Sequence, residues 1–257
     1  MTIVFAFANQ KGGVGKTTTA VTLADGLARM KVNTLLVDLD PQGHLALSFG
    51  LDKSSGLYQL VCLDEPLEKV KVNIRPHLDL VPGDKQTEKV KRQITLSDFR
   101  ETILSDILKV APYDAVLLDM APSLDVLHIN GLIAADWVVI PTRLDALAVD
   151  GVKEILTTMA EVTRSGHNYR GYSILPTFFD RTTRETLIQF QELAKTFGEH
   201  LWPPIPQDTR VRETAAYGKT LWDYSPHSTA MEGYPEGRQK LGGYRQVLGR
   251  MLEVVNG

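Results

Sequence analysis

Cysteine and long hydrophobic runs are scarce in this sequence, and each scarcity excludes a class of protein. Cys62 is the only cysteine among 257 residues, which excludes a disulfide framework within the chain and is typical of a reducing compartment. No segment approaches the roughly 18–20 apolar residues that a membrane-spanning helix needs. The first apolar stretch also lacks the basic leader of a signal peptide. We therefore expect a cytoplasmic protein.

An excess of charge of one sign is also lacking. The net charge is −3, so the field of the whole molecule gives no reason to expect nucleic acid. The kind of cation changes along the chain, however, from four arginines and ten lysines before residue 129 to ten arginines and four lysines from there on. Arginine binds phosphates better than lysine does, because its planar guanidinium can donate two parallel hydrogen bonds. The arginines of the second half could therefore form a phosphate-binding face. The alternative is that they are ordinary solvated surface residues.

The most informative segment is residues 10–18, QKGGVGKTT, which nearly fits the phosphate-binding loop G-x-x-x-x-G-K-[ST]. Gln10 stands where that pattern has its first glycine, but three other glycines remain to let successive backbone N–H groups face a polyphosphate. A helix that begins near Lys16 adds its positive end, Lys16 can reach the β- and γ-phosphates, and Thr17 can offer its hydroxyl to Mg²⁺. The ordinary loop gives no role to Lys11.

Short apolar runs alternate with helix-compatible stretches, and this alternation predicts an α/β fold with a doubly wound, mostly parallel sheet flanked by helices. The expected strands cover residues 3–8, 34–38, 78–81, 115–119, 137–140 and 172–175, and the expected later helices cover residues 97–110, 126–134, 149–164 and 183–197. Neither a repeat nor a linker interrupts the pattern. We therefore expect one domain over residues 1–257, with ordered loops at 202–206 and 225–243.

Two of the expected strands end in acidic residues, where a nucleotide site would need them. Asp38 closes the first of these strands in LLVDLDPQG, and Asp119 closes the second in VLLDMAPS. A carboxylate beside a phosphate loop commonly holds Mg²⁺, directly or through water, and Asp119 suits that role. Asp38 is better suited to orienting the attacking water or accepting its proton. Asp40 can shape the loop or assist the metal.

Together these motifs resemble a known family. Residues 11–18, 37–43 and 118–123 are similar to the three nucleotide motifs of the ParA/MinD family, the P-loop ATPases with a deviant Walker A motif. Residues 140–151 resemble the segment that follows a strand in the ParA branch, and residues 205–220 resemble its nucleotide-base and DNA-contact region. The likeness covers nearly the whole chain.

The resemblance implies a role for Lys11 as the signature lysine, which reaches across a dimer interface to the phosphates of the partner's nucleotide. It further implies that ATP is sandwiched between two subunits, that hydrolysis separates them, and that turnover is weak without an activator. The implied catalytic residues are Lys11, Lys16 and Asp38, and the implied metal residues are Thr17, Asp40 and Asp119. The implied nucleotide-binding residues are Lys11, Gly12, Gly13, Val14, Gly15, Lys16, Thr17 and Thr18 at the phosphates, with Pro206 and Asp208 near the adenine.

For ParA-type members, the resemblance implies non-specific binding to double-stranded DNA and a ParB-like or other cargo-bound activator protein. Arg210 matches the family's contact arginine, and Arg212, Arg181 and Arg184 could extend a phosphate-contacting surface. Helix capping or salt bridging is the alternative for these arginines. The sequence starts at the first strand, so we expect a short form without an N-terminal helix-turn-helix domain. The implied function is to segregate a plasmid, a chromosome or a protein cargo on the nucleoid.

Two other kinds of protein remain as alternatives. A MinD-like ATPase would bind membrane through a C-terminal amphipathic helix, and residues 241–255 do carry one apolar helical stripe. The polar side of that stripe lacks a dense basic border for anionic lipid, which favours a helix packed on the domain and no membrane partner. A metabolic P-loop ligase or metal-cluster carrier would need a substrate pocket or a cysteine pair, and the sequence indicates neither.

Four residues depart from the family pattern. Ala121 replaces the first proline of a Pro-Pro pair, and Asp125 places an acid where small residues are usual. Thr214 and Ala215 replace Ala-Pro. None of these changes removes a catalytic group, but each bears on the path of a loop or on activator contacts.

Overall fold

The computed structural model describes residues 2–98 and 100–257, and a seven-stranded sheet forms its centre. The strand order is β3-β4-β2-β5-β1-β6-β7, and every neighbouring pair is parallel except β3 with β4. The strands are β1 (Ile3–Phe7), β2 (Thr34–Asp38), β3 (Val72–Arg75), β4 (Leu78–Val81), β5 (Ala115–Asp119), β6 (Trp137–Arg143) and β7 (Gly171–Thr177). The predicted doubly wound, mostly parallel sheet is confirmed.

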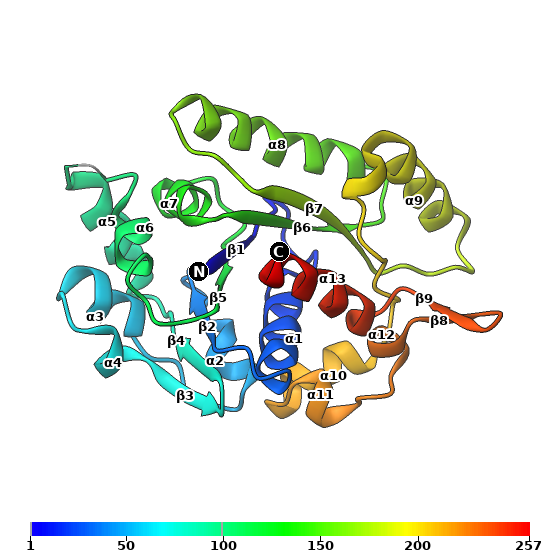
Figure 1. The fold of residues 1–257 in the computed structure, drawn as a ribbon, viewed down its shortest axis with the longest axis horizontal. Coiled ribbons are helices and arrows are strands. Elements are labelled where there is room, and N and C mark those ends of the chain that lie inside the picture. The colour runs from blue at the N-terminus through cyan, green and yellow to red at the C-terminus, as the bar shows by residue number, and fades with distance from the viewer. Residues whose placement is uncertain (1, 99) are drawn as a thin grey trace.

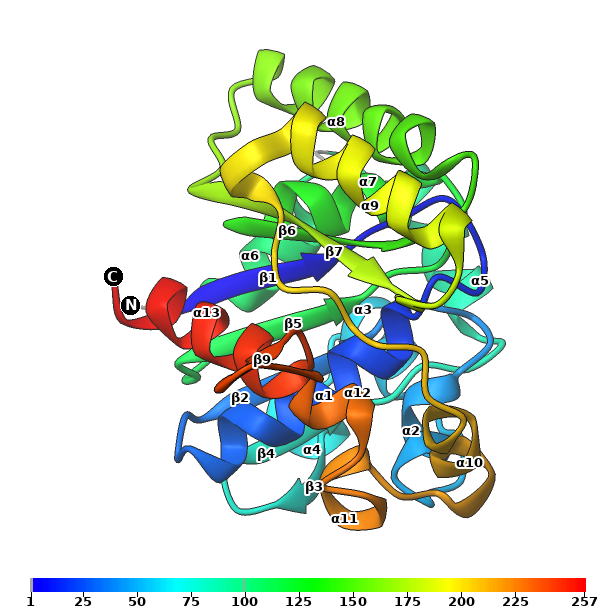
Figure 2. The ribbon, with the colours of Figure 1, turned by 90° about the vertical axis from the view of Figure 1, so that its right-hand side faces the viewer.

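Helices cover both faces of this sheet (Figures 1 and 2). They are α1 (Lys16–Arg29), α2 (His44–Ser48), α3 (Gly56–Cys62), α4 (Leu67–Val70), α5 (Thr87–Leu96), α6 (Ile103–Leu108), α7 (Val126–Ala134), α8 (Ala148–Arg164), α9 (Arg184–Phe197), the short 3-10 helix η1 (Gly198–His200), α10 (Arg210–Tyr217), α11 (Leu221–Tyr224), α12 (Thr229–Glu232) and α13 (Tyr244–Asn256). A separate antiparallel hairpin joins β8 (Tyr234–Glu236) to β9 (Gln239–Leu241).

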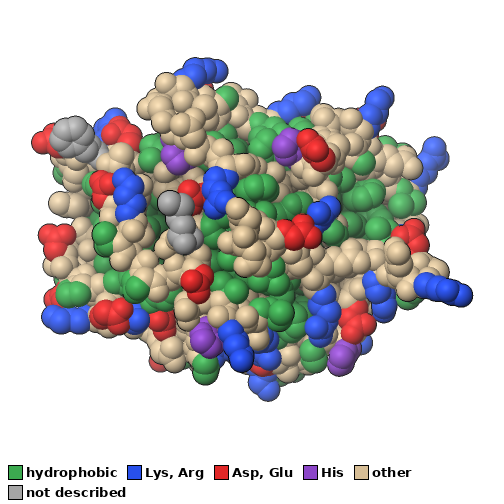
Figure 3. All heavy atoms as spheres, viewed as in Figure 1, with side chains coloured by type: hydrophobic (Ala, Val, Ile, Leu, Met, Phe, Trp, Pro, Cys, Tyr) green, Lys and Arg blue, Asp and Glu red, His purple; other side chains and the backbone are tan. Residues whose placement is uncertain are grey.

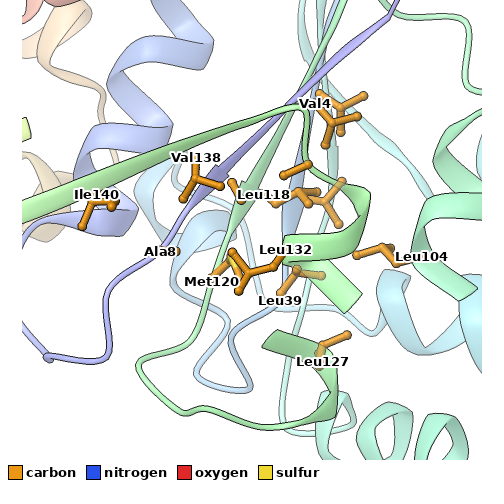
Figure 4. Close-up of a cluster of buried hydrophobic side chains, with 14 of the residues drawn as sticks. Val4, Ala8, Leu39, Leu104, Leu118, Met120, Leu127, Leu132, Val138 and Ile140 are labelled. Atoms are coloured by element: carbon orange, nitrogen blue, oxygen red, sulfur yellow. The ribbon is translucent and has the colours of Figure 1, made fainter. Parts of the chain in front are cut away.

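The core forms two clusters, one on each face of the sheet, because successive strand residues point to opposite faces. On β1, Val4 packs in the cluster with α7 and α8, whereas Ile3 and Phe5 pack in the cluster with α1 and α13. Figure 4 shows part of the first cluster, where Leu118 and Val138 lie beside α7. Strands buried on both faces read as continuous apolar runs, which is why they were recognisable in the sequence.

The predicted helix over residues 97–110 is wrong. Helix α5 ends at Leu96, and the next described helix, α6, covers only Ile103–Leu108; position 99 lies outside the described residues. The segment between them is held by a side chain: Asn130 Nδ2 donates to the Arg100 carbonyl (2.8 Å) and Asn130 Oδ1 accepts from Leu104 N (3.2 Å). These tertiary hydrogen bonds replace helical ones, so periodicity alone could not locate the break.

The C-terminal segment differs from the prediction in one part and agrees in another. Residues 225–243 are not only loop, because they contain α12, β8 and β9. The apolar stripe on α13 is confirmed as a packing face, since Tyr244, Val247, Leu248 and Met251 are buried. It lies so close to α1 that a Cβ on Gly26 would come within 2.9 Å of Leu248 Cδ2. Within the part of the chain that the structure describes, no helix is long and apolar enough to cross a membrane.

Candidate nucleotide site

The phosphate loop connects β1 to the 14-residue helix α1 at the carboxyl edge of the sheet. Gly13 and Gly15 have φ angles of 70° and 90°, in the left-handed region that favours glycine. Gly15 is the N-cap of α1 and, as a glycine, has no side chain with which to cap the helix. The backbone N–H groups of the first helical turn therefore remain available to an anion.

Two side chains that sequence reasoning missed hold this loop in place. Asn9 Nδ2 donates to the Pro141 carbonyl (2.8 Å), and Asn9 Oδ1 accepts from Lys11 N (2.9 Å). The Thr177 hydroxyl donates to the Val14 carbonyl (2.9 Å). The loop is thus tied to β6 and β7, and the Val14 side chain is buried beneath it. The available signal was a polar Asn9 directly after a buried strand.

Lys16 is the buried cation of the site. Burial lowers the pKa of Lys16, and the nearby carboxylates of Asp119 and Asp40 offset part of that lowering. Its Nζ donates to the Lys11 carbonyl (3.1 Å), which closes the loop on itself. A polyphosphate in the loop would supply the negative charge that favours the ionised ammonium group.

Asp38 and Asp119 lie side by side, because they are paired residues of β2 and β5. Burial, followed by the charge of Asp119, raises the pKa of Asp38 well above its usual value. The Asp38 carboxylate accepts hydrogen bonds from Asp40 N (3.0 Å) and Leu45 N (3.2 Å). In this conformation Asp38 therefore shapes the loop between β2 and α2.

Asp119 fits a magnesium ligand. Burial raises the pKa of Asp119 to about 7, although hydrogen bonding from Thr17 and the charge of Lys16 counteract the rise. Its Oδ1 is buried and makes no hydrogen bond of normal geometry within residues 2–98 and 100–257. A divalent cation would satisfy this oxygen and offset the repulsion between the two buried carboxylates. The Thr17 hydroxyl and the carboxylate of Asp40 complete an all-oxygen donor set of the kind that Mg²⁺ prefers.

A cavity of about 580 Å³ extends from the phosphate loop to the segment after β7. The residues that line it are Gly12, Gly13, Gly15, Lys16, Thr17, Thr18, Asp40, Gln42, His44, Pro122, Thr177, Phe178, Ile205, Pro206, Gln207, Asp208, Thr209, Val211, Arg212, Ala215 and Tyr244. Pro206 and Asp208 thus line the same cavity as the loop. The Asp208 carboxylate accepts from Arg210 N (3.0 Å) and Ala230 N (3.2 Å), so it also shapes the cavity wall.

Two aromatic residues of the cavity escaped the sequence interpretation. Phe178 has a φ of 55°, which is unusual for a bulky residue, and the Arg143 guanidinium lies 5.0 Å from the centre of its ring. The Tyr244 hydroxyl is 3.1 Å from the Thr19 hydroxyl, which joins α13 to α1 below the loop. Both aromatic residues are distant in sequence from the loop, so only folding brings them to it.

Similarities to known proteins place the chain in a family. A family model described as an AAA domain matches residues 2–170. The chain is 40% identical over 232 residues to the chromosome-partitioning ATPase Soj of Thermus thermophilus, which covers 89% of this chain and 91% of that protein. The chain belongs to the ParA/Soj family of P-loop ATPases.

Solved structures agree with this assignment. A putative plasmid partition protein from Borrelia burgdorferi bound to AMPPNP has the same fold, with a TM-score of 0.80 at 21% identity over 99% of this chain and 100% of that one. Cobyrinic acid a,c-diamide synthase from Mycobacterium smegmatis, with bound ADP and magnesium, is 31% identical, with a TM-score of 0.73 over 85% of this chain and 93% of that one. This ParA-family ATPase therefore shares its fold with nucleotide-bound proteins.

In this ParA-family ATPase, Lys11 does not line its own cavity. Its Nζ donates to the Leu147 carbonyl and lies 3.7 Å from Asp145 Oδ1, in the segment between β6 and α8. The stem of the side chain passes close to Gly151, where a Cβ would lie 3.2 Å from Lys11 Cε. The two lysines of the loop thus point to different places, Lys16 to the cavity and Lys11 to the neighbouring loop.

The four arginines predicted to bind DNA fall into two groups by their contacts. Arg210 lies 3.8 Å from Asp208 Oδ2, and Arg212 lines the nucleotide cavity. Arg181 instead contacts the β8–β9 hairpin, and Arg184 is the first residue of α9. The structure therefore places Arg212 in the cavity wall and Arg210 beside Asp208 of that wall, whereas Arg181 lies at the hairpin.

A buried histidine lies under the loop that follows Asp119. Asp125 caps α7 by accepting from Leu127 N and His128 N, and it forms an ion pair with Lys91 (2.8 Å). His128 is only 3% exposed, and neither ring nitrogen makes a hydrogen bond of normal geometry with the described residues. Burial lowers the pKa of His128 to about 4, although the charge of Asp125 opposes this and that of Lys16 adds to it.

Replacing His128 with Phe is expected to remove part of the acid sensitivity of folding. The imidazole pKa falls from 6.5 to about 4 on folding, so the unfolded chain binds more protons between these values and stability is lost as pH falls. Between about pH 7 and about pH 5, wild type should lose about 2 kcal/mol relative to the variant. Urea unfolding of both proteins at the two pH values measures this. A difference that does not change with pH would contradict it.

Proposed function

We propose that this ATPase dimerises on Mg-ATP and uses the dimer to position a cargo. The observation that carries the proposal is the second loop lysine: Lys11 belongs to the phosphate loop, yet its Nζ contacts the Leu147 carbonyl and the residue does not line its own cavity. A cation placed there is available to the phosphates of a second subunit's nucleotide. The proposal treats residues 1–257 as one ATPase domain.

We assign the chemical steps to the chain's own residues. The loop N–H groups and Lys16 bind the β- and γ-phosphates, while Thr17, Asp119 and Asp40 would hold Mg²⁺. When bound, Mg²⁺ neutralises charge that develops on the phosphate oxygens. Asp38 orients the attacking water. Asp38 is fully buried in this conformation, so the loop between β2 and α2 has to shift during the cycle before a water can reach its carboxylate.

In the proposed cargo cycle, ATP-driven dimerisation and hydrolysis alternate. The ATP-bound dimer binds double-stranded DNA of the nucleoid without sequence preference, and a ParB-like or other cargo-bound activator stimulates hydrolysis and release. Similarity to the chromosome-partitioning ATPase Soj of Thermus thermophilus supports a chromosome cargo, and a plasmid or protein cargo would use the same chemistry. Such a protein works in the cytoplasm. The packing of α13 against α1 favours DNA over membrane as the surface that the dimer holds.

A DNA mobility shift measured with ATP, with ADP and without nucleotide tests the proposal. We expect ATP-dependent binding that weakens steeply as salt rises, because phosphate contacts release counterions. Co-sedimentation with anionic liposomes under the same conditions should show no ATP dependence. Binding to liposomes in place of DNA would support the MinD-like alternative instead.

Asp145→Ala is expected to lower the ATP concentration needed for dimerisation by about two- to fivefold. The reason is that the half-exposed Asp145 helps to hold Lys11 within its own subunit, and such a pair contributes about 0.2–1 kcal/mol. Size-exclusion chromatography with light scattering across an ATP titration measures the midpoint. Glu154→Ala, which removes an exposed acid from α8, is the matched control. An unchanged midpoint for Asp145→Ala would show that the ion pair with Asp145 does not hold Lys11 back from dimerisation.

A further inference from the structure

The β8–β9 hairpin projects from the body of the molecule and pairs with no strand of the main sheet (Figure 1). Residues 235–240 are all exposed. Gly237 has a φ of 59°, as the first position of a tight two-residue turn to Arg238 requires. An isolated two-stranded hairpin is only marginally stable in water, so other contacts must hold it.

The base of the hairpin is fixed by close backbone packing. A Cβ on Gly242 would lie 2.0 Å from the Pro204 carbonyl oxygen, and a Cβ on Gly233 would lie 2.4 Å from the Gly242 carbonyl oxygen. Gly243 N donates to the Pro204 carbonyl (2.8 Å). The Tyr234 hydroxyl, in turn, donates to the carbonyl of Phe179 (3.2 Å). The arm therefore leaves the body in a defined direction.

Cations gather along this arm and at its base. The Arg181 guanidinium lies 4.7 Å from the centre of the Tyr234 ring and donates to the carbonyl of Pro235 (3.3 Å). Pro235 pairs with Lys240 in the hairpin, so Lys240 lies beside the residue whose carbonyl Arg181 contacts. Figure 3 shows Lys and Arg side chains at the right-hand end of this face, where the hairpin projects. Lys240 forms an exposed ion pair with Glu232 (3.3 Å), whereas neither Arg181 nor Arg238 has a carboxylate partner within 4.0 Å among the described residues.

The chemistry of the arm fits a polyanion better than a protein. Protein interfaces depend on apolar and aromatic anchors, and every large hydrophobic side chain that is strongly exposed in the described chain lies outside residues 233–245. Unpaired guanidinium groups on a rigid support instead match the spaced phosphates of a duplex. A shallow hollow beside Lys240 and Arg245 continues the surface toward α13.

We propose that the β8–β9 hairpin, with Arg238 and Lys240 on the arm and Arg181 at its base, contacts the phosphate backbone of double-stranded DNA. This inference rests on the proposed function, in which the ATP-bound dimer holds DNA, and it assigns the contact to a named element. It also moves the centre of the surface away from Arg212, which lines the cavity, and from Arg210, which lies beside Asp208 of the cavity wall.

The test uses the double variant Arg238→Glu/Lys240→Glu in the full chain. Fluorescence anisotropy with a random-sequence duplex and ATP should show binding at least about tenfold weaker than wild type, and a slope of log K against log salt that is smaller by about 1–2. Neither residue lies at the nucleotide site, so basal ATP turnover and ATP-dependent dimerisation should not change. The control Arg164→Glu/Lys195→Glu makes the same charge change at exposed positions on α8 and α9 and should weaken binding much less.

Each of the other outcomes would overturn the hairpin's role, the proposed function or both. Wild-type affinity and salt slope in the hairpin variant, or an equal loss in the control, would overturn the hairpin's role while leaving the proposed function intact. Normal DNA binding combined with loss of stimulation by an activator protein would reassign the arm to that partner and overturn the proposal. No ATP-dependent DNA binding by wild type would overturn the proposed function and the hairpin's role together.

Discussion

Lys11→Ala is expected to bind ATP almost as tightly as wild type and to fail to dimerise. Within its own subunit the Lys11 side chain contacts the segment between β6 and α8 and passes Gly151 of α8, and it does not line the cavity, so its loss should leave the cavity intact. Across a dimer it would be a desolvated cation on phosphate, and truncating one partner of such a pair costs about 2–5 kcal/mol. We therefore expect ATP-dependent dimerisation to weaken by about 100-fold or more, and DNA binding to be lost with it.

Sedimentation velocity with ATP, together with titration of a fluorescent ATP analogue, separates these two effects. Lys16→Ala is the contrasting variant, because it should lose nucleotide binding itself: Lys16 lines the cavity. A Lys11→Ala protein that dimerises and binds DNA normally in ATP would show that the second lysine has no role across an interface.

Asp38→Asn is expected to lower kcat by about 100- to 1000-fold while ATP binding and dimerisation persist, because a positioned acid or base contributes about that much to rate. Single-turnover hydrolysis in the presence of an activator or DNA measures the chemical step directly. Asp38→Ala should lower kcat to a similar extent. Retained ATP turnover in either variant would exclude Asp38 from positioning the water.

The stability of Asp38→Asn provides an independent control. Burial raises the pKa of Asp38, so its ionised form costs stability at neutral pH, and that cost disappears as pH falls through the raised pKa. Asparagine carries no charge and still offers an oxygen to Asp40 N, while its NH2 group replaces the oxygen that accepts from Leu45 N, which offsets part of the gain. We expect an unfolding midpoint at neutral pH equal to or above that of wild type. Loss of activity without loss of stability would separate catalysis from folding.

The phosphate loop and the two strand-end carboxylates were predictable because they depend on local spacing in the sequence. Three glycines followed by Lys16 and Thr17 dictate a phosphate loop wherever a strand precedes and a helix follows. Apolar runs ending at Asp38 and Asp119 bring those carboxylates to one edge, since parallel strands end on the same side. Neither inference depends on residues that are far away in the sequence.

Other parts of the site could not be predicted, because their partners are far away in the chain. Thr177 contacts the loop across 163 positions, and the Tyr244 hydroxyl meets Thr19 across 225. The break near residue 97 depends on Asn130, and β8 and β9 are three residues each, too short for a period to show. Neither composition nor periodicity records such contacts.

By itself, the sequence determined the class of fold, the nucleotide loop with its two lysines, and the acidic residues that face it, because each is encoded by neighbours in the chain. Only the tertiary structure decided where Lys11 points and which arginines stand together. It also turned a glycine- and proline-rich stretch into a rigid basic arm. The reason is physical: long-range packing, such as that of Gly242 against Pro204, sets the direction of a side chain or a hairpin, and no local pattern encodes it.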